Sequence, residues 1–214
     1  MELTEIEVRV LGCLIEKEMT TPDYYPMTAN SMVSACNQKS NRSPVVDYGE
    51  TEVVDAVDRL RNRGLARTVH GKGDRSLKYR HVATETLKIT SRQGALLAVL
   101  LLRGPQTLGE LRSRTSRYTE FADLADVADE LRAMADAEEP RVEMLRHRPG
   151  EKESRYRHLF GSSTDDPDEP TLEPEAVAFE SDSSRVDELE TELGELRERV
   201  ARMERELGLD LDLT

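Results

Sequence analysis

The sequence lacks the features that mark several classes of protein. Its 214 residues include no Trp, three Phe and two cysteines, Cys13 and Cys36. Two cysteines cannot build the disulfide framework of a small secreted domain, and they fit a reducing compartment. The apolar run from Leu96 to Leu102 is far shorter than the ~20 residues of a membrane-spanning helix. No basic segment with an apolar stretch behind it opens the chain, so we expect a cytoplasmic protein with no membrane partner.

The net charge of −13 comes from one segment of the chain. Residues 1–84 carry 12 Lys/Arg and 12 Asp/Glu, residues 85–160 carry 13 of each, and residues 161–214 carry 5 and 18. Because the first 160 residues are neutral overall, the acidity of the chain neither favours nor excludes nucleic acid as a partner. Local clusters of charge have to decide that question.

A pattern of helix signals occurs twice in the first 160 residues. Each copy opens with a Thr that is followed three residues later by Glu or Gln, at Thr4 and Glu7 and again at Thr90 and Gln93. This spacing predicts a capping box, in which the two side chains bond the free amides at a helix start, and Thr107 with Glu110 predicts another. The second of these helices is expected to end at Gly104, which Pro105 follows.

Two further helices and a hairpin are predicted in each copy. The first copy has a short helix over 28–37, an amphipathic helix with Val53, Val57 and Leu60 on one face, and strands over 65–70 and 77–82. The second copy has a helix from Thr107 and strands over 141–145 and 154–159. Its amphipathic helix has on one face Phe121, Leu124, Val127, Leu131 and Met134. This order is typical of a winged helix, a helix-turn-helix fold with a hairpin. We expect a mainly α protein with small β hairpins, in the α+β class, with winged-helix domains at 1–84 and 85–160.

The tail divides into two segments of different composition. Residues 161–183 are rich in Ser, Asp, Glu and Pro and predict an acidic flexible linker. Residues 184–208 have apolar residues at alternating spacings of three and four, which predicts a coiled-coil helix. Its seam consists of Val186, Leu189, Leu193, Leu196, Val200, Met203 and Leu207.

Charges beside this seam favour a parallel homodimer. In a parallel pair the flanking positions of the two chains would match residues of opposite sign. The matched pairs are Arg185 with Glu190, Glu192 with Arg197, and Arg199 with Glu204. An antiparallel pair would instead bring like charges together, and the remaining alternative is a lone amphipathic helix packed on the body. We therefore expect the seam residues to form the dimerisation site.

Several short motifs resemble those of the YceH-like family of bacterial proteins over about residues 1–160. They are Thr20-Thr21-Pro22 with Tyr25-Pro26, Ala35-Cys36-Asn37-Gln38-Lys39, Asn41-Arg42, Leu100 to Gly104, Gln106-Thr107, Gly109-Glu110-Leu111-Arg112, Pro149-Gly150 and Arg155-Tyr156. The resemblance implies tandem winged helices and a tail helix. The family has no assigned function, so the resemblance transfers no catalytic residue.

The first predicted hairpin is the most basic part of the chain. Eight cations lie between Arg59 and His81, and Asp74 is the one acid among them. A glycine-rich turn with cations suits a wing that follows a phosphate backbone. A second polar run, over 37–42, holds amides and cations that can bond base edges. The candidate nucleic-acid-binding residues are Arg63, Arg67, Lys72, Arg75, Lys78, Arg80, Lys39 and Arg42. The alternatives are a hairpin whose cations are simply solvated and a polar run that caps a helix end.

The predicted third helices are acidic, which speaks against a major-groove role for them. The second carries Asp123, Asp126, Asp129 and Glu130, with Arg132 as its one cation. Carboxylates would repel phosphates, so we expect the second domain to meet a protein partner. Two functions remain: a dimeric nucleic-acid-binding protein, such as a transcriptional regulator on duplex DNA, or a protein-interaction scaffold with winged helices as docking surfaces.

Signals for catalysis are weak. The four histidines, His70, His81, His147 and His158, stand singly, without the ligand spacing of a zinc site. Cys13 lies in an apolar helix, Cys36 has no neighbouring base, and the glycines around Lys72 do not form a phosphate-binding loop. We expect a non-enzyme with no catalytic residue, no metal and no cofactor.

Overall fold

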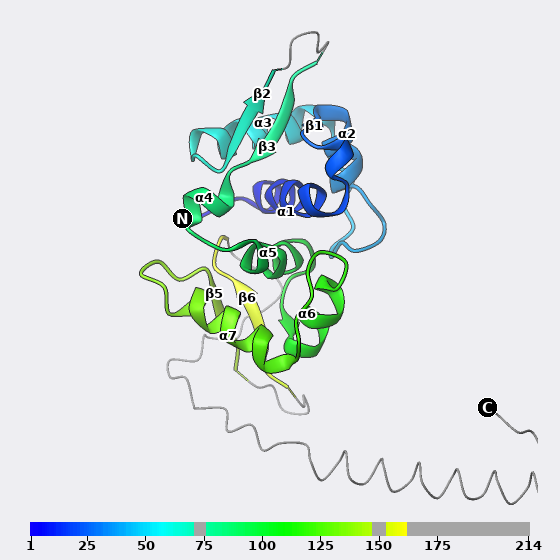
Figure 1. Ribbon diagram of the computed structural model, residues 1–214. Coiled ribbons are helices and arrows are strands. Elements are labelled where there is room, and N and C mark those ends of the chain that lie inside the picture. Colours follow the sequence, from blue (N-terminus) through cyan, green and yellow to red (C-terminus); the bar gives the residue numbers. More distant parts are fainter. Residues whose placement is uncertain (71–75, 147–152, 162–214) are drawn as a thin grey trace, which may run out of the picture. The chain divides into compact units, whose positions relative to one another are not determined.

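Helices and strands begin close to the capping and turn residues described above. The computed structural model describes residues 1–70, 76–146 and 153–161, which belong to one compact unit (Figure 1). Lys72, Arg75, the predicted linker beyond Gly161 and the predicted coiled coil with its seven seam residues lie outside the described residues. Their assignments stay predictions.

The described residues mix helices with short strands, which confirms the α+β class. The helices are α1 Glu5–Thr20, α2 Ala29–Cys36, α3 Glu50–Asn62, α4 Ala83–Leu87, α5 Ser91–Arg103, α6 Leu108–Thr115 and α7 Leu124–Ala135, with a 3-10 turn over Pro22–Tyr24. The strands are β1 Met27–Thr28, β2 Ala66–Val69, β3 Lys78–His81, β4 Gln106–Thr107, β5 Val142–Met144 and β6 Arg155–His158. Within the described part of the chain, no helix combines the length and apolarity needed to cross a membrane.

Capping boxes open α1, α5 and α6 at the predicted positions. The hydroxyl of Thr4 accepts the backbone N–H of Glu7 at 3.4 Å, while the Thr4 N–H donates to the Glu7 carboxylate at 2.7 Å. Gly104 follows α5 with φ +73°, a value that glycine adopts without strain. The prediction that Phe121 belongs to the third helix of the second copy is wrong, because α7 starts at Leu124. Phe121 lies before that helix, and its side chain is buried.

Each half of the described chain has the same sheet topology. The first half (α1 to β3) has strand order β1-β3-β2, the second half (α5 to β6) has order β4-β6-β5, and all pairs are antiparallel. The registers are equivalent, since Met27 lies opposite Tyr79 and Gln106 lies opposite Tyr156. The two-residue strands β1 and β4 were not predicted, because two residues are too few to show an alternating pattern.

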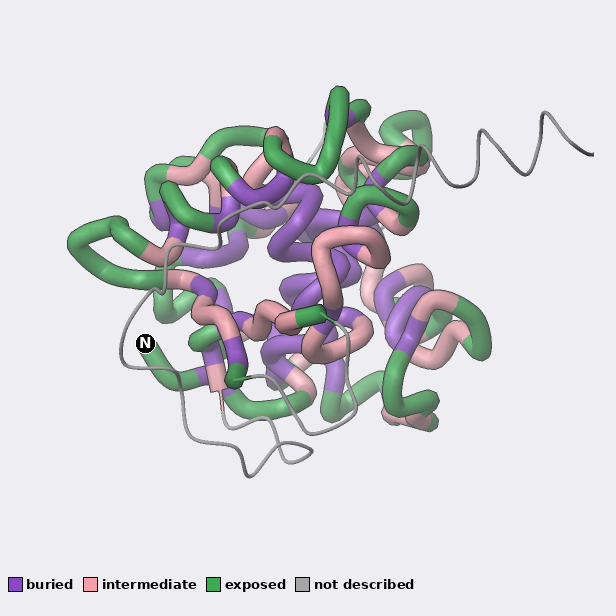
Figure 2. Tube along the Cα trace, turned by 90° about the horizontal axis from the view of Figure 1, so that it is seen from below, coloured by how far each residue is buried: buried purple, intermediate pink, exposed green. Residues whose placement is uncertain are grey.

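The two halves share a buried centre. Helices α1 and α5 pack against each other (Figure 1), and the buried segments gather around them (Figure 2). The cluster around α1 includes Leu97 and Leu101 of α5 together with Phe160, which follows β6. A second cluster joins the other face of α5 to α6, α7 and β5. The division into domains at 84/85 stays a prediction, and α4 spans that position.

Candidate nucleic-acid interface

The outward face of the β2–β3 hairpin is basic. Along β3, Tyr79 and His81 are buried, while Lys78 and Arg80 alternate with them on the other face. The strand register places Arg67 of β2 directly opposite Arg80. Side chains directly opposite each other in an antiparallel pair share a face, so Arg67, Lys78 and Arg80 form one basic surface, which we call the basic face.

The buried side of the same hairpin is anchored to α1 and to the turn after it. The backbone N–H of His81 donates to the hydroxyl of Tyr25 at 2.7 Å, and Nε2 of His81 lies 2.7 Å from the carboxylate of Glu18. Burial lowers the pKa of His81, although the charge of Glu18 opposes that shift. The anchored inner side fixes the direction in which the basic face points.

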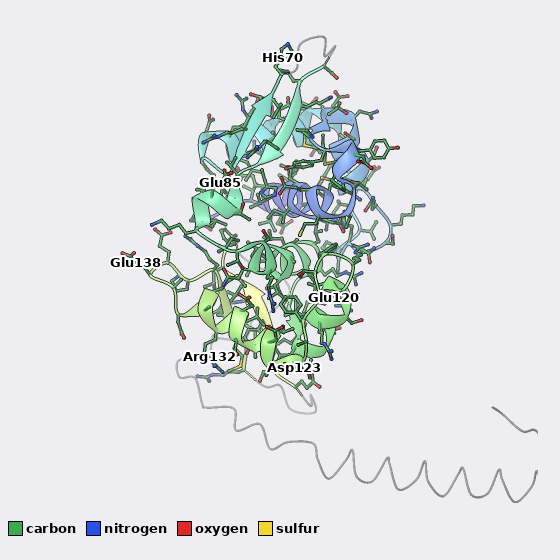
Figure 3. All side chains as sticks on the ribbon, viewed as in Figure 1. His70, Glu85, Glu120, Asp123, Arg132 and Glu138 are labelled. Atoms are coloured by element: carbon green, nitrogen blue, oxygen red, sulfur yellow. The ribbon has the colours of Figure 1, made fainter. Side chains whose placement is uncertain are left out.

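The cations of the basic face have different surroundings. Arg80, which is partly exposed, contacts Glu85 of α4 at 3.2 Å. The side chain of Glu85 is exposed (Figure 3). Arg67 is exposed and forms no ion pair within the described residues. An exposed pair such as Arg80–Glu85 is weak, so Arg80 can exchange this partner for another anion at little cost.

Arg63 lies at the base of the hairpin and is already partly neutralised. Its Nε lies 3.7 Å from the carboxylate of Glu7, which also binds Arg59 at 3.1 Å. Burial would raise the pKa of Glu7, but hydrogen bonds from Thr4 and the charges of Arg63 and Arg59 hold that pKa below its usual value. Arg63 therefore contributes less positive field than its position in the sequence suggests.

Arg42 is buried, which contradicts its prediction as a nucleic-acid-binding residue. Its guanidinium is fully buried and bonds the carboxylate of Glu16 at 2.5 and 3.3 Å and the carbonyl of Ala35 at 3.0 Å. Its other two N–H groups donate to the carbonyl of Asn41 at 2.8 Å and to the amide oxygen of Gln38 at 3.0 Å, so no donor is left for a nucleic acid. Lys39, from the same polar run, is exposed.

Among its described residues, the hairpin of the second half keeps cations at two of these positions, Arg155 and Arg157, but differs at the third. Arg157 occupies the position in β6 that Arg80 has in β3, but its neighbour across the strands is Glu143. The two side chains form an ion pair, which neutralises that part of the sheet. The repeat thus has Arg opposite Arg in one half and Glu opposite Arg in the other.

Helix α7 presents carboxylates to solvent. Asp123 and Asp129 are exposed, and Arg132 contacts Asp129 at 3.2 Å. Figure 3 labels Asp123 and Arg132 in this region. Helix α3 begins with the exposed residues Glu50 and Glu52. The exposed carboxylates that the sequence places on both helices would repel a phosphate backbone.

One polar cluster was missed by reasoning from the sequence. The buried carboxylate of Glu16 accepts bonds from Arg117 at 2.6 Å and from the hydroxyl of Tyr118 at 3.0 Å, in addition to Arg42. Arg103 lies nearby and donates to the side chain of Asn41. These residues come from four separate segments, so no local motif could have grouped them.

The described residues hold no group of three or more His, Cys, Asp and Glu side chains placed to bind a metal ion. Cys13 and Cys36 are both buried and unbridged. His158, the counterpart of His81 in the repeat, accepts the backbone N–H of Phe160 at 3.2 Å through Nδ1. His81 makes the equivalent bond, accepting the backbone N–H of Ala83 at 3.3 Å through Nδ1.

Comparison with known proteins points to a single family. Residues 3–151 match the model described as "Protein of unknown function, DUF480". The chain is 45% identical over 200 residues to a UPF0502 protein of Geotalea uraniireducens, an alignment that covers 92% of this chain and 91% of the relative. It is also 45% identical over 212 residues to UPF0502 protein YceH of Salmonella paratyphi B, with 97% and 98% covered.

Proposed function

The chain belongs to the DUF480 family of YceH-like bacterial proteins, whose function is unknown, and from its surface we propose that it binds nucleic acid. In this proposal the first hairpin contacts phosphates, the protein acts as a dimer, and its role is that of a transcriptional regulator rather than an enzyme. Each half is proposed to be a winged helix, because three helices, a short early strand and a terminal hairpin recur in both.

The observation that carries the proposal is the difference between the two hairpins. At equivalent positions the first hairpin places Arg67 opposite Arg80, and the second places Glu143 opposite Arg157. Two like charges opposite each other destabilise a sheet slightly. That arrangement is useful if an anion binds both, since phosphate contacts by cations release counterions and favour binding.

The test exchanges the charges at these equivalent positions. Arg67→Glu gives the first hairpin the charge pattern of the second, and Glu143→Arg does the reverse in the second hairpin. With a mixed-sequence duplex, we expect Arg67→Glu to weaken binding and to reduce the slope of log K against log salt by about 0.9 for each phosphate that is no longer neutralised. Glu143→Arg should leave both quantities at or above the wild-type values.

Folding is the control for this pair of variants. Arg67→Glu removes a like-charge pair on an exposed face, so it should not lower the free energy of unfolding, which circular dichroism during urea unfolding can check. If wild type and Arg67→Glu have equal salt slopes, or if the wild type does not bind duplex at physiological salt, the basic face does not contact phosphate.

That outcome would favour the second candidate, a protein-interaction scaffold. The observation in its support is the surface at α7, where Asp123 and Asp129 face solvent, while Glu143 of the neighbouring hairpin pairs with Arg157. An acidic surface suits a basic protein partner better than a nucleic acid. Both candidates can hold at once if the two halves bind different partners.

A further inference from the structure

A small pocket with three arginines opens where α5 and α6 end. It has a volume of about 210 Å³. We call it the arginine pocket; its lining includes Asn41, Arg103, Ser113, Arg114, Arg117 and Tyr118. The residues come from the loop after α2, from the last turns of α5 and α6, and from the turn after α6. None of these lining residues is acidic.

The loop that carries Asn41 is fixed against the pocket from both sides. Arg42 is buried on Glu16, and the backbone N–H of Ser43 donates to the carbonyl of Leu102 at 2.9 Å. Asn41 itself has φ +61°, a left-handed conformation that Asn tolerates better than most residues. The side chain of Asn41 is thereby presented to Arg103 at the edge of α5.

Positive charge exceeds negative charge around this pocket. Arg114 contacts Glu110 at 3.0 Å, and Arg117 contacts the buried Glu16 at 2.6 Å, but Glu16 is shared with Arg42 and with Lys17 at 3.6 Å. The carboxylates that pair with the lining arginines are thus Glu110 and Glu16, and Glu16 is shared with two further cations.

Arg103 is the cation of this described group that has no carboxylate partner. Its side-chain partner is the neutral amide oxygen of Asn41. Partial burial and the charges of Arg114, Arg117 and Arg42 all lower the pKa of Arg103. A guanidinium held among other guanidiniums gains most from an anion that several of them can share.

We propose that the arginine pocket binds a phosphate group. Guanidinium forks match the oxygens of phosphate, and the hydroxyl of Ser113 and the amide of Asn41 add donors of the kind that orient such a group. The volume lies below the ~300–1,000 Å³ usual for pockets that enclose a drug-sized ligand, so the pocket fits the phosphate and not a whole nucleotide.

The phosphate can belong to a free small molecule or to a nucleic-acid backbone, and the chemistry of recognition is the same. A plain alternative also exists, in which Arg103 only compensates the negative C-terminal end of α5. That alternative gives no saturable affinity for phosphate. The arginine pocket shares no residue with the basic face, which is formed by a different part of the chain, so the two sites can be tested separately.

The test titrates the full chain with inorganic phosphate at constant ionic strength, with chloride as the reference anion, and follows backbone amide chemical shifts. We expect saturable shifts for residues 41, 103 and 113–118 with phosphate and none with chloride. Arg103→Gln should weaken phosphate binding at least tenfold. Arg103→Lys, which keeps the charge but loses the fork, should weaken it less. Arg132→Gln, an exposed arginine of α7 outside the pocket, should have no effect.

A parallel titration with mixed-sequence duplex separates the two sources of phosphate. Loss of inorganic phosphate binding in Arg103→Gln with unchanged duplex affinity assigns the pocket to a free phosphate, and loss of both assigns it to the backbone. The inference would be overturned if the wild type did not bind phosphate saturably. It would also be overturned if the wild type, Arg103→Gln and Arg103→Lys bound phosphate equally well. Because Arg103→Lys retains the positive charge, it keeps the test valid if Arg103→Gln does not fold.

Discussion

His158 shows how one buried side chain couples folding to pH. The residue is 9% exposed, and its Nδ1 accepts a backbone N–H, which only the neutral ring can do. Burial, with a smaller effect of Arg157, lowers the pKa of His158 to about 4 from its usual 6.5. Between these two values the unfolded chain binds a proton that the folded chain does not.

The free energy of unfolding should therefore fall as pH drops from about 6.5 to about 4. A shift of this size corresponds to about 3 kcal/mol at the acid end of the window. Urea unfolding at a series of pH values would measure it, and His158→Gln should flatten the curve in this window. His81, whose pKa is also lowered, adds to the same slope, so part of it should survive in the variant.

The carboxylates affect the free energy of unfolding in a lower pH range, so their effect can be separated from that of the histidines. Glu7 and Glu16 have pKa values held below 4.5, chiefly because hydrogen bonds and arginines outweigh the opposing effect of burial. Their contribution is present above that value and is lost at lower pH. If His158→Gln had the same slope as the wild type between pH 6.5 and 4.5, the assignment to His158 would be wrong.

Whether an individual cation is buried or exposed was the property hardest to predict from the sequence. Arg42 and Lys39 lie in one polar run, yet Lys39 is exposed and Arg42 is buried. The difference comes from Glu16 on α1, which is distant in sequence and captures one guanidinium. Charge counts along a segment identify a basic region, but they do not identify which cations have partners.

Gly12 determines how closely two helices approach. A Cβ at this position in α1 would lie 2.9 Å from Leu102 of α5, closer than real side-chain contacts allow. Gly94 of α5 is different, because a Cβ there would meet Thr84 at 3.5 Å, an ordinary contact distance. Gly12 and Gly94 both lie within helices, α1 and α5, so alanine substitutions at the two positions can be compared directly.

Gly12→Ala should lower the free energy of unfolding by about 1–3 kcal/mol, because an overpacked core has to shift. Gly94→Ala should leave it unchanged or raise it by up to about 1 kcal/mol, since alanine favours the helix. Denaturant unfolding of both variants measures the difference. Equal effects of the two substitutions would mean that α1 and α5 separate easily and that Gly12 has no special role.

At the scale of elements, local signals predicted local structure well. Capping boxes at Thr4, Thr90 and Thr107 are formed as their spacing predicts, because all of their partners lie within one helical turn. β1 and β4 could not be predicted in the same way. Each is two residues long and exists because a distant strand, β3 or β6, supplies its hydrogen-bond partners.

The contact between the two halves could not be predicted from their repeat. The sequence places an apolar helix at the start of each copy, but only the structure shows that α1 and α5 pack together in one buried centre. The arginine pocket has the same origin, since Asn41 meets Arg103 only because that packing brings the two halves together.

Assembly is the remaining prediction for the whole molecule, and it is drawn from the tail sequence. We expect the full chain to be a dimer in solution and a chain lacking residues 184–214 to be a monomer, as measured by light scattering. Leu196→Lys, at a seam position, should weaken the dimer, whereas Thr191→Lys, outside the seam, should not. Equal masses for the full and truncated chains would show that the tail does not drive assembly.

The backbone hydrogen bond between Leu3 and the segment after β6 has a topological consequence. The N–H of Leu3 donates to the carbonyl of Phe160 at 2.6 Å, so the backbone of residues 3–160 comes close to forming a ring. A short Gly/Ser linker from residue 161 to residue 2 could close that ring, and a new opening between the exposed residues Glu138 and Glu139 would create a circular permutant. We expect this permutant to keep the wild-type circular dichroism spectrum. In this permutant β5 and β6 come first in the chain, so the second half would form from two segments at opposite ends of the sequence.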